Sequence, residues 1–400
     1  QRCGRPVLVT AVSARDRRKD RGINLEAVRW FDDPVALAGD PEIDVVIELI
    51  GGAEGVAKEV TETALASGKH VITANKAMIA HHGTELARRA EEAGAVLSYE
   101  AAVCGGIPVI KSLREGLAAN AISAVYGIMN GTSNFILSQM RDTGREFSEV
   151  LQEAQKLGYA EADPSFDVDG YDAAHKLAIL AALAFNAEVD YANLHVEGIR
   201  DVTSVDIAFA EELGYRIKLL GIAKRENGKI SQRVHPVMVK RNVPIANVEG
   251  VNNAVVAEGD FVGSILSEGA GAGAGPTASA VVADLIDIAR GIRLPTFAVP
   301  ASALEAATPA PMAEHEGGYY LRLMCLDRPG VIAGVAAALR DHDISVETLV
   351  QRGRGPGGEA VPVVITTHET QESAMRGALA QIEALEAVLE PPRVIRIEAF

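Results

Sequence analysis

Two lysines stand where a lysine could take part in proton transfer. Lys176 lies within residues 173–187, a largely apolar stretch in which it is the one certain charge and His175 a possible one. A helix that is apolar on nearly all sides is buried, and a lysine inside it needs a partner or a shifted pKa. Asp172 precedes Lys176 by four residues, so the two side chains share one helix face. We therefore expect a buried pair that can transfer a proton; an ordinary surface ion pair is the alternative.

An acidic loop precedes this expected helix. Four carboxylates fall within nine residues, with Pro164 constraining the turn: Glu161, Asp163, Asp167 and Asp169. Carboxylates accept hydrogen bonds from ammonium and hydroxyl groups, so this loop favours a pocket for a substrate that carries both. A solvated loop, or a helix N-cap at Asp169, is the alternative.

The second lysine, Lys76, follows an apolar stretch that reads as a strand. Expected strands alternate with expected helices in this part of the chain: strands 7–12, 43–50, 70–74 and 95–99, and helices 54–67 and 84–93. Strands of this kind, without polar alternation, indicate a parallel sheet covered on both faces. That is the doubly wound, Rossmann-like α/β class, whose ligands bind at the carboxyl ends of the strands. Lys76 lies at such an end, although an ordinary loop lysine would have the same surroundings in sequence.

Several residues suit a dinucleotide cofactor. Gly51 and Gly52 follow the second expected strand, and Gly271 and Gly273 lie in a Gly-Ala run that opens a helix to Ala289. Small residues let a dinucleotide approach the backbone, whereas a flexible loop is the alternative for the Gly-Ala run. Arg15 follows the first strand, where an arginine favours the 2′-phosphate of NADP over NAD. An exposed basic turn is the alternative there.

One element of a dinucleotide fold is not found. No strand with a G-x-G-x-x-G turn precedes Val7, although such a unit normally holds the pyrophosphate. We expect residues 1–108 to be an incomplete NAD(P)-binding domain whose first strand and helix are disordered, omitted or truly absent.

The rest of the chain divides into two further expected domains. Residues 109–300 should form an α+β catalytic and dimerisation domain, with a largely antiparallel sheet and helices on one side. Residues 301–317 fall in a proline-rich linker, and residues 318–400 show a βαββα pattern with a last strand, of the ferredoxin-like kind. The segments on which this rests are strands 124–129, 232–239 and 253–258, helices 148–157 and 170–185, and a Gly-rich turn after residue 351.

Composition excludes several classes. The formal net charge of -16 argues against nucleic acid and anionic membrane surfaces as partners. The three cysteines, Cys3, Cys104 and Cys325, are far apart and show no CxxC spacing, which indicates a reducing, cytoplasmic compartment and no zinc site. No apolar run approaches the roughly 18 residues of a membrane span.

The segment from Ala154 to Lys176 resembles the signature of homoserine dehydrogenases, with Gly158, Glu161, Asp163, Asp167, Gly170 and Asp172 in matching positions. Three further blocks resemble the same family: residues 130–137, residues 73–76, and the Gly-Ala run continuing through residues 276–282. The resemblance implies an enzyme that interconverts L-homoserine and L-aspartate 4-semialdehyde with NADP or NAD. Lys176 would be the general acid/base, and desolvation would lower its pKa enough for it to accept a proton.

The resemblance implies further roles as well. Lys76 would be a second catalytic lysine near the nicotinamide, Asp172 and Glu161 would bind the hydroxyl and amino ends of the substrate, and Gly158 would contact the cofactor. Residues 100–108 resemble the family's site for a monovalent cation, Na⁺ or K⁺. Its ligands would be the Glu100 side chain and the carbonyls of Val103, Gly105 and Ile107, although a plain Gly-Pro turn into a helix is the alternative.

The C-terminal unit resembles an ACT domain through residues 326–331 and 343–346. Such domains pair side by side and bind amino acids, which implies a homodimer or homotetramer and an effector such as threonine; a purely assembling domain is the alternative. Two other functions compete with the dehydrogenase. A catalytically silent amino-acid sensor would have no use for Lys76, Asp172 and Lys176, and another reductase of the aspartate pathway would not carry the signature that ends at Lys176.

Overall fold

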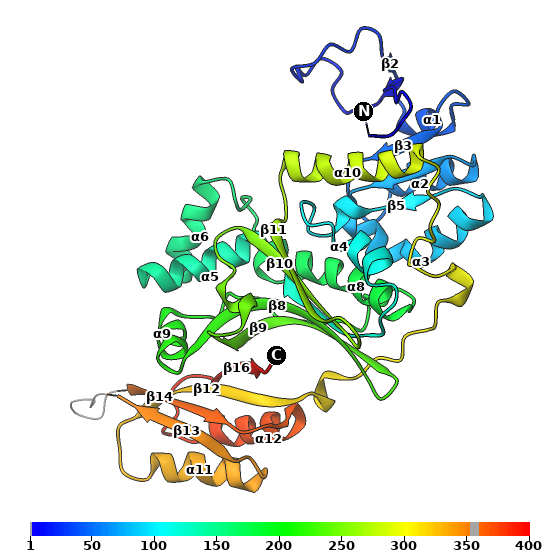
Figure 1. The fold of residues 1–400 in the computed structure, drawn as a ribbon. Helices are drawn as coiled ribbons and strands as arrows, with labels where there is room; N and C mark the ends of the chain where they lie inside the picture. Colours follow the sequence, from blue (N-terminus) through cyan, green and yellow to red (C-terminus); the bar gives the residue numbers. More distant parts are fainter. Residues whose placement is uncertain (1, 353–359) are drawn as a thin grey trace.

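The computed structural model describes residues 2–352 and 360–400. Figure 1 shows three units in a row: a front α/β domain, a central sheet with helices, and a C-terminal unit of strands and two helices. Within these described ranges, no helix is long and apolar enough to cross a membrane.

The front domain is built on a parallel sheet, as predicted. Its strands are β3 (Val45–Glu48), β4 (His70–Thr73) and β5 (Leu97–Ser98), in that order. The helices of this unit are α1 (Pro34–Gly39), α2 (Val56–Ala66) and α3 (Lys76–Glu92). The prediction placed the start of α3 eight residues too late. Asn75 caps this helix by accepting a hydrogen bond from the Met78 amide at 3.0 Å, so Lys76 is its first residue.

The first predicted strand is largely wrong. Only β1 (Ala11–Val12) forms, and it pairs in parallel with β2 (Arg29–Trp30) as a separate small sheet. The three preceding apolar residues are 45%, 77% and 70% exposed: Val7, Leu8 and Val9. A strand needs a hydrogen-bonding partner, and no described strand pairs with these residues.

The central sheet is antiparallel, as predicted, in the order β11-β10-β6-β8-β9. Its strands are β6 (Ile122–Ile128), β8 (Tyr215–Glu226), β9 (Lys229–Lys240), β10 (Asn252–Gly259) and β11 (Gly263–Ala270). The longer helices of this unit are α5 (Gly131–Thr143), α6 (Phe147–Lys156), α8 (Tyr171–Phe185) and α9 (Ser204–Glu212). The sequence analysis did not identify α5, α9, β8 or β11.

After β11 the chain returns to the front domain. Helix α10 (Ala274–Ala289) packs on β4 and on the short 3₁₀ turn Glu100–Ala102, and Figure 1 shows it beside the front domain. Further along, the Tyr99 hydroxyl donates to the Thr296 carbonyl at 2.8 Å. The stretch that was predicted to end the catalytic domain therefore contacts the front domain as well.

The C-terminal unit has the predicted βαββα order with a last strand. Its elements are β12 (Glu316–Leu326), α11 (Val331–Asp341), β13 (Val346–Gln351), β14 (Ala360–Thr367), α12 (Glu372–Glu383) and β16 (Arg393–Glu398). The predicted Gly-rich turn falls on residues 353–359, outside the described residues. Strand β16 pairs in parallel with β9, so within the described ranges the central and C-terminal strands belong to one sheet.

Buried ion pairs cross this junction. Arg322 of β12 donates to Asp206 of α9 at 2.7 Å, and the Tyr320 hydroxyl donates to the same carboxylate at 3.1 Å. Arg233 of β9 pairs with Glu398 of β16 at 2.5 Å. Because each of these charges has a partner of opposite sign, the C-terminal unit is joined to the central sheet through polar contacts as well as strand pairing.

Candidate active site

One carboxylate holds two lysines at the centre of the molecule. Asp172 Oδ2 lies 2.8 Å from Lys176 Nζ, and Asp172 Oδ1 lies 2.7 Å from Lys76 Nζ. Asp172 and Lys176 are buried, whereas the Lys76 side chain is 33% exposed. The two predicted catalytic lysines are therefore brought together, and the less buried one lies at the border with solvent.

The surrounding elements explain this meeting. Lys176 and Asp172 lie one turn apart on α8, as the i,i+4 spacing predicts, and Lys76 begins α3, which packs against α8. Helix α8 starts after Gly170, whose φ of +90° favours glycine. A Cβ at this position would also lie 3.1 Å from the Val196 side chain, so the close approach of the two segments requires a glycine.

The pKa of Lys176 moves in the direction opposite to the prediction. Burial alone would lower this pKa, but the Asp172 carboxylate, with smaller contributions from Cys104 and Asp167, raises it above its ordinary value. Burial likewise opposes ionisation of Asp172, yet the two lysines hold its pKa well below its usual range. The site therefore rests as a lysine ammonium beside a carboxylate.

Residues at the junction of β6 and α5 complete the centre. Lys176 Nζ also donates to the Met129 carbonyl at 2.7 Å. Asn130 Nδ2 donates to Asp172 Oδ2 and to Asp167 Oδ1, both at 2.8 Å. Asn130 was predicted only as part of a family-like block, because α5, the helix that it caps, was not predicted from the sequence.

Aromatic side chains form one wall beside the lysines. The His175 ring stacks on Tyr191 with 4.6 Å between centroids, and its Nε2 lies 3.3 Å from Nε2 of His81. Phe166 covers the same cluster, with its ring centroid 5.5 Å from Lys76 Nζ. Burial and the neighbouring His81 lower the pKa of His175 to about 4, so this imidazole is neutral at physiological pH.

Two predicted site residues lie away from these contacts. Glu161 is exposed on the loop before α7 (Ser165–Val168), and its backbone carbonyl accepts from Gln155 at 3.0 Å. Gly158 has φ of +76° just after α6, and its amide donates to the Gln155 carbonyl, which is the conformation of a glycine that ends a helix. The structure thus gives Gly158 a local reason to be glycine.

Gly51 and Gly52 present open backbone at the end of β3. Both have positive φ, both are exposed, and a Cβ on Gly51 would meet nothing within 4 Å. Glu48 accepts hydrogen bonds from the amides of Ile50 and Gly51, and Asn75 donates to the Gly52 carbonyl at 2.7 Å. The glycines and Lys76 therefore lie at the carboxyl end of the same sheet, where free space and exposed backbone fit a dinucleotide.

The Gly-Ala run is held close to the loop after β5. A Cβ on Gly271 would lie 2.1 Å from the Asn253 side chain, so that contact requires glycine. Ala270 accepts a hydrogen bond from the Gly106 amide at 2.9 Å, and Gly273 has φ of +115° where α10 begins. Gly271 is therefore packed against Asn253, whereas Gly273 is exposed at the start of α10.

The loop proposed to bind a cation begins with a buried acid. Both Glu100 carboxylate oxygens accept backbone hydrogen bonds, from the Ile110 amide at 3.0 Å and the Lys111 amide at 2.9 Å. Burial, with the nearby Asp284, raises the pKa of Glu100 to about 7. Val103, Gly105 and Ile107 lie buried in the same turn, and the Ile107 carbonyl accepts from the Val109 amide at 2.7 Å. These contacts fit the alternative of a turn into a helix and leave cation binding untested.

Arg15 lies in an exposed basic turn after β1. The Arg17 and Arg21 guanidinium groups lie over the Trp30 ring, 5.7 and 5.6 Å from its centroid. Arg21 also donates to the Asp16 carbonyl at 2.8 Å. The basic character predicted for this turn is thus shared by several arginines, which the sequence analysis did not single out.

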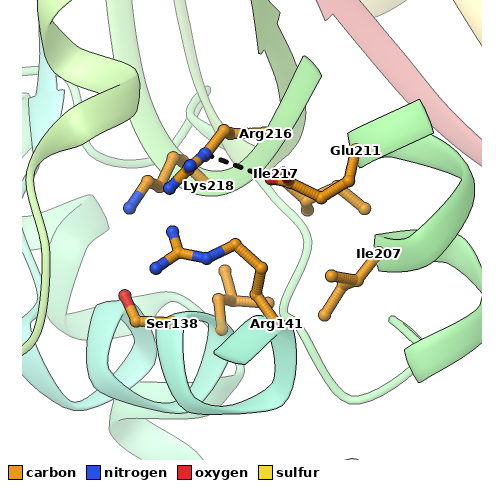
Figure 2. Close-up of a pocket in the computed structure, with 8 residues that line it drawn as sticks. Ser138, Arg141, Ile207, Glu211, Arg216, Ile217 and Lys218 are labelled. Atoms are coloured by element: carbon orange, nitrogen blue, oxygen red, sulfur yellow. Dashed lines mark ion pairs between the residues drawn. The ribbon is translucent and has the colours of Figure 1, made fainter. Parts of the chain in front are cut away.

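A small pocket lies apart from all of these residues. Figure 2 shows its lining, in which Arg141 of α5, Glu211 of α9, and Arg216 and Lys218 of β8 converge. None of the predicted site residues lines it. Among the described residues, no group of three or more histidine, cysteine, aspartate or glutamate side chains is arranged to hold a metal ion.

Family models match the chain in three blocks. Residues 1–100 match a model described as the NAD-binding domain of homoserine dehydrogenase, and residues 108–286 match one described as homoserine dehydrogenase. Residues 319–386 match the ACT domain. The three matches follow the order of the front, central and C-terminal units.

Known proteins are similar over nearly the whole chain. A homoserine dehydrogenase from Neisseria gonorrhoeae is 47% identical over 100% of this chain and 93% of its own length. The crystal structure of a homoserine dehydrogenase from Thiobacillus denitrificans has a TM-score of 0.92 at 47% identity, covering 99% of this chain and 91% of that one. A hyperthermophilic archaeal homoserine dehydrogenase in complex with NADPH has a TM-score of 0.58 at 31% identity, covering 68% of this chain and 78% of that one.

Proposed function

The chain belongs to the homoserine dehydrogenase family, and from this premise we propose that Lys176, Asp172 and Lys76 carry the proton transfer of its reaction. The protein is an NAD(P)-dependent oxidoreductase that interconverts L-homoserine and L-aspartate 4-semialdehyde. Neither a silent amino-acid sensor nor another aspartate-pathway reductase agrees with relatives of this identity over the full chain.

In the reducing direction, Lys176 acts as the general acid. The bound nicotinamide supplies the hydride that reaches the aldehyde carbon. The ammonium of Lys176 donates a hydrogen bond to the aldehyde oxygen and gives up its proton as that oxygen becomes a hydroxyl. Asp172 keeps Lys176 protonated beforehand, because the carboxylate raises the pKa of its partner.

In the oxidising direction, Lys176 must first lose that proton. The same carboxylate opposes this loss, so oxidation of homoserine should have its optimum at a higher pH than reduction of the semialdehyde. Lys76 holds the other oxygen of Asp172 and is close enough to solvent to pass protons outward.

The acidic side chains around the lysines suit the two polar ends of the substrate. Asp172 would bind the hydroxyl, and Glu161 would bind the ammonium group. Asp167 is a further candidate for the ammonium, because Asn130 holds its carboxylate beside Asp172. Glu161 would reach the substrate only from its exposed loop.

The observation that carries this proposal is the single buried carboxylate shared by two lysines. Lys176→Met keeps the length of the side chain and removes its proton. We expect NADPH oxidation with aspartate semialdehyde to fall by about 1,000-fold, while NADPH binding, followed by its fluorescence, is retained. Lys58→Met, on the surface of α2, is the matched control. Full turnover by Lys176→Met would refute the assignment.

The cofactor would lie along the carboxyl ends of β3 and β4. Gly51 and Gly52 offer open backbone there. From the central unit, the cofactor would be contacted by Gly271, Gly273 and Gly158. Arg15, within an exposed basic turn, supports NADP over NAD. A related archaeal homoserine dehydrogenase has a solved complex with NADPH, which agrees with this preference.

A monovalent cation, Na⁺ or K⁺, would bind the turn that Glu100 opens, with the carbonyls of Val103, Gly105 and Ile107 as further oxygen ligands. Support comes from the buried Glu100 carboxyl, whose raised pKa a cation would lower again. Denaturation midpoints in potassium chloride and in tetramethylammonium chloride test this, since a bound cation should stabilise the wild type and leave Glu100→Gln unaffected.

The ACT domain would bind an amino acid such as threonine and join copies of the chain into a homodimer or homotetramer. Strand β13 is the free edge of its sheet among the described strands, and Val346 and Leu349 on it are exposed. Light scattering would give the assembly, and inhibition by threonine but not by valine would identify the effector.

A further inference from the structure

Asn130 sits where the central strand β6 leads into helix α5. Its side-chain oxygen accepts a hydrogen bond from the Ser133 amide at 2.8 Å and so caps the helix. This contact sets the orientation of the amide group, because an amide oxygen accepts and an amide nitrogen donates. The Asn130 nitrogen is therefore directed away from the helix and toward the lysines.

That nitrogen has two hydrogens, and each meets a different carboxylate. Asn130 Nδ2 lies 2.8 Å from Asp167 Oδ1 and 2.8 Å from Asp172 Oδ2. Asn130 is 5% exposed, and its oxygen and both of its N–H groups have partners. Ser133, in the first turn of the same helix, also donates to the Asp167 carbonyl at 3.0 Å, so α5 holds the backbone as well as the side chain of this aspartate.

The buried Asp172 carboxylate and the half-buried Asp167 carboxylate lie side by side and oppose each other's ionisation. Burial raises the pKa of Asp167, the charge on Asp172 raises it further, and the Asn130 hydrogen bond lowers it. The other charged groups that act on Asp167 come from two helices: Lys176 of α8 and Lys76 of α3, both of which lower its pKa. Asn130 is the neutral donor that both carboxylates share.

We infer that Asn130 is a positioning residue: its one amide nitrogen holds the Asp167 and Asp172 carboxylates side by side and facing the proton-transferring lysine. The adjacent Met129 carbonyl accepts from Lys176 Nζ, so the same two-residue junction fixes both partners of the buried pair. This inference rests on the proposed roles of Lys176 and Asp172.

Asn130→Asp provides the sharpest test. Aspartate is a good helix cap and nearly isosteric, so α5 should keep its N-terminus while the shared N–H donor is lost. We expect kcat/KM for semialdehyde reduction to fall by about 100-fold, as misplacement of a catalytic group does. The acid limb of the pH profile of kcat/KM should move to higher pH, because the N–H donor that lowers the pKa of Asp167 is lost and a third carboxylate raises that pKa further.

Asn134→Ala is the matched control. Asn134 is a buried asparagine on the same helix, and its amide donates to the Val248 and Asn252 carbonyls rather than to the catalytic carboxylates. This variant should lose stability without moving the acid limb. If Asn130→Asp fails to fold, Asn130→Ser keeps a cap and one donor and should show a smaller shift in the same direction.

The outcomes distinguish a failure of the positioning role of Asn130 from a failure of the role proposed for Lys176. An unchanged acid limb and unchanged kcat/KM in folded Asn130→Asp or Asn130→Ser would overturn the positioning role, even while Lys176→Met is inactive. A shift of the same size in Asn134→Ala would also overturn it, because a purely structural effect would then suffice. Activity in Lys176→Met would instead refute the proposed function.

Discussion

Helix α8 and the carboxyl end of β3 differ in the exposure of their polar groups. At α8, the charges of Asp172 and Lys176 are buried, and each has at least two partners. At the end of β3, Gly51 and Gly52 are exposed, and space in front of Gly51 is open. The charged groups of the first region hold one another in place, whereas the second region offers backbone that a ligand can approach.

This difference agrees with the roles proposed for the two regions, which are proton transfer at α8 and cofactor binding at the end of β3. Proton transfer depends on distances that a mobile side chain would not keep, so its groups are held by a buried network. A dinucleotide is long and is bound by many small contacts, which an open, glycine-lined edge can supply. Substitutions at α8 should therefore change kcat, whereas substitutions at the sheet edge should change KM for the cofactor.

Asp172→Asn should have the largest effect. Removing the charge that both lysines share should lower kcat for semialdehyde reduction by about 1,000-fold. The pKa of Lys176 should fall, because burial then acts without the carboxylate that now outweighs it, so the alkaline limb of the pH profile should move to lower pH. Asp169→Asn, which breaks the exposed pair with Arg200, is the control. An unmoved alkaline limb would contradict this account.

In a buffer without Na⁺ or K⁺, Glu100 should make stability depend on pH. Its pKa is about 7 in the folded protein and 4.5 ordinarily, so the folded state binds this proton more tightly. The contribution is present below pH 4.5 and is lost as pH rises through 7, by about 3 kcal/mol. Urea denaturation should show that Glu100→Gln gains on the wild type across this range. A constant difference between the two proteins at all pH values would show that the acid is not buried as described.

At the open edge, Gly51→Ala should act mainly on the cofactor. Its φ of +87° is strained for alanine, although the new Cβ meets no neighbour. We expect about 1 kcal/mol of lost stability and KM for NADPH raised roughly tenfold, with kcat nearly unchanged. Steady-state kinetics at saturating semialdehyde measure both. A drop in kcat with unchanged KM would erase the proposed division between the two regions.

Arg15→Glu should have the smallest effect. An exposed arginine that contacts a 2′-phosphate contributes about 1 kcal/mol, so KM for NADPH should rise several-fold and KM for NADH should stay the same or fall. The ratio of the two kcat/KM values is the measurement. Equal changes for both cofactors would assign Arg15 to general electrostatics rather than to cofactor choice.

Local patterns predicted the catalytic helix well and the meeting of its partners poorly. The apolar run placed α8 to within a residue, because a helix buried on every side needs no knowledge of its neighbours. The convergence of Lys76 and Asn130 on Asp172 depends on contacts between residues far apart in sequence. For this reason burial was expected to lower the pKa of Lys176, and the effect of the carboxylate was underestimated.

The front domain shows the converse error. Val7, Leu8 and Val9 have the composition of a strand but no strand beside them, so apolar composition alone overestimated β1. The cap at Asn75 marks the start of α3, but the unbroken pattern of the preceding strand concealed it. Both errors arise because a strand forms its backbone hydrogen bonds with neighbouring strands, whereas a helix forms them within itself.

The pairing of β16 with β9 sets the order in which the molecule can be completed. Strand β9 ends at Lys240, yet β16, which pairs with its outer edge, begins only at Arg393. During synthesis Val237–Val239 of that edge stay without this partner until β16 has been made, whereas β7 (His195–Val196) pairs with Arg233 and Val234. Nascent chains that stall or end early would therefore expose a strand edge with unpaired amides, and such an edge invites aggregation.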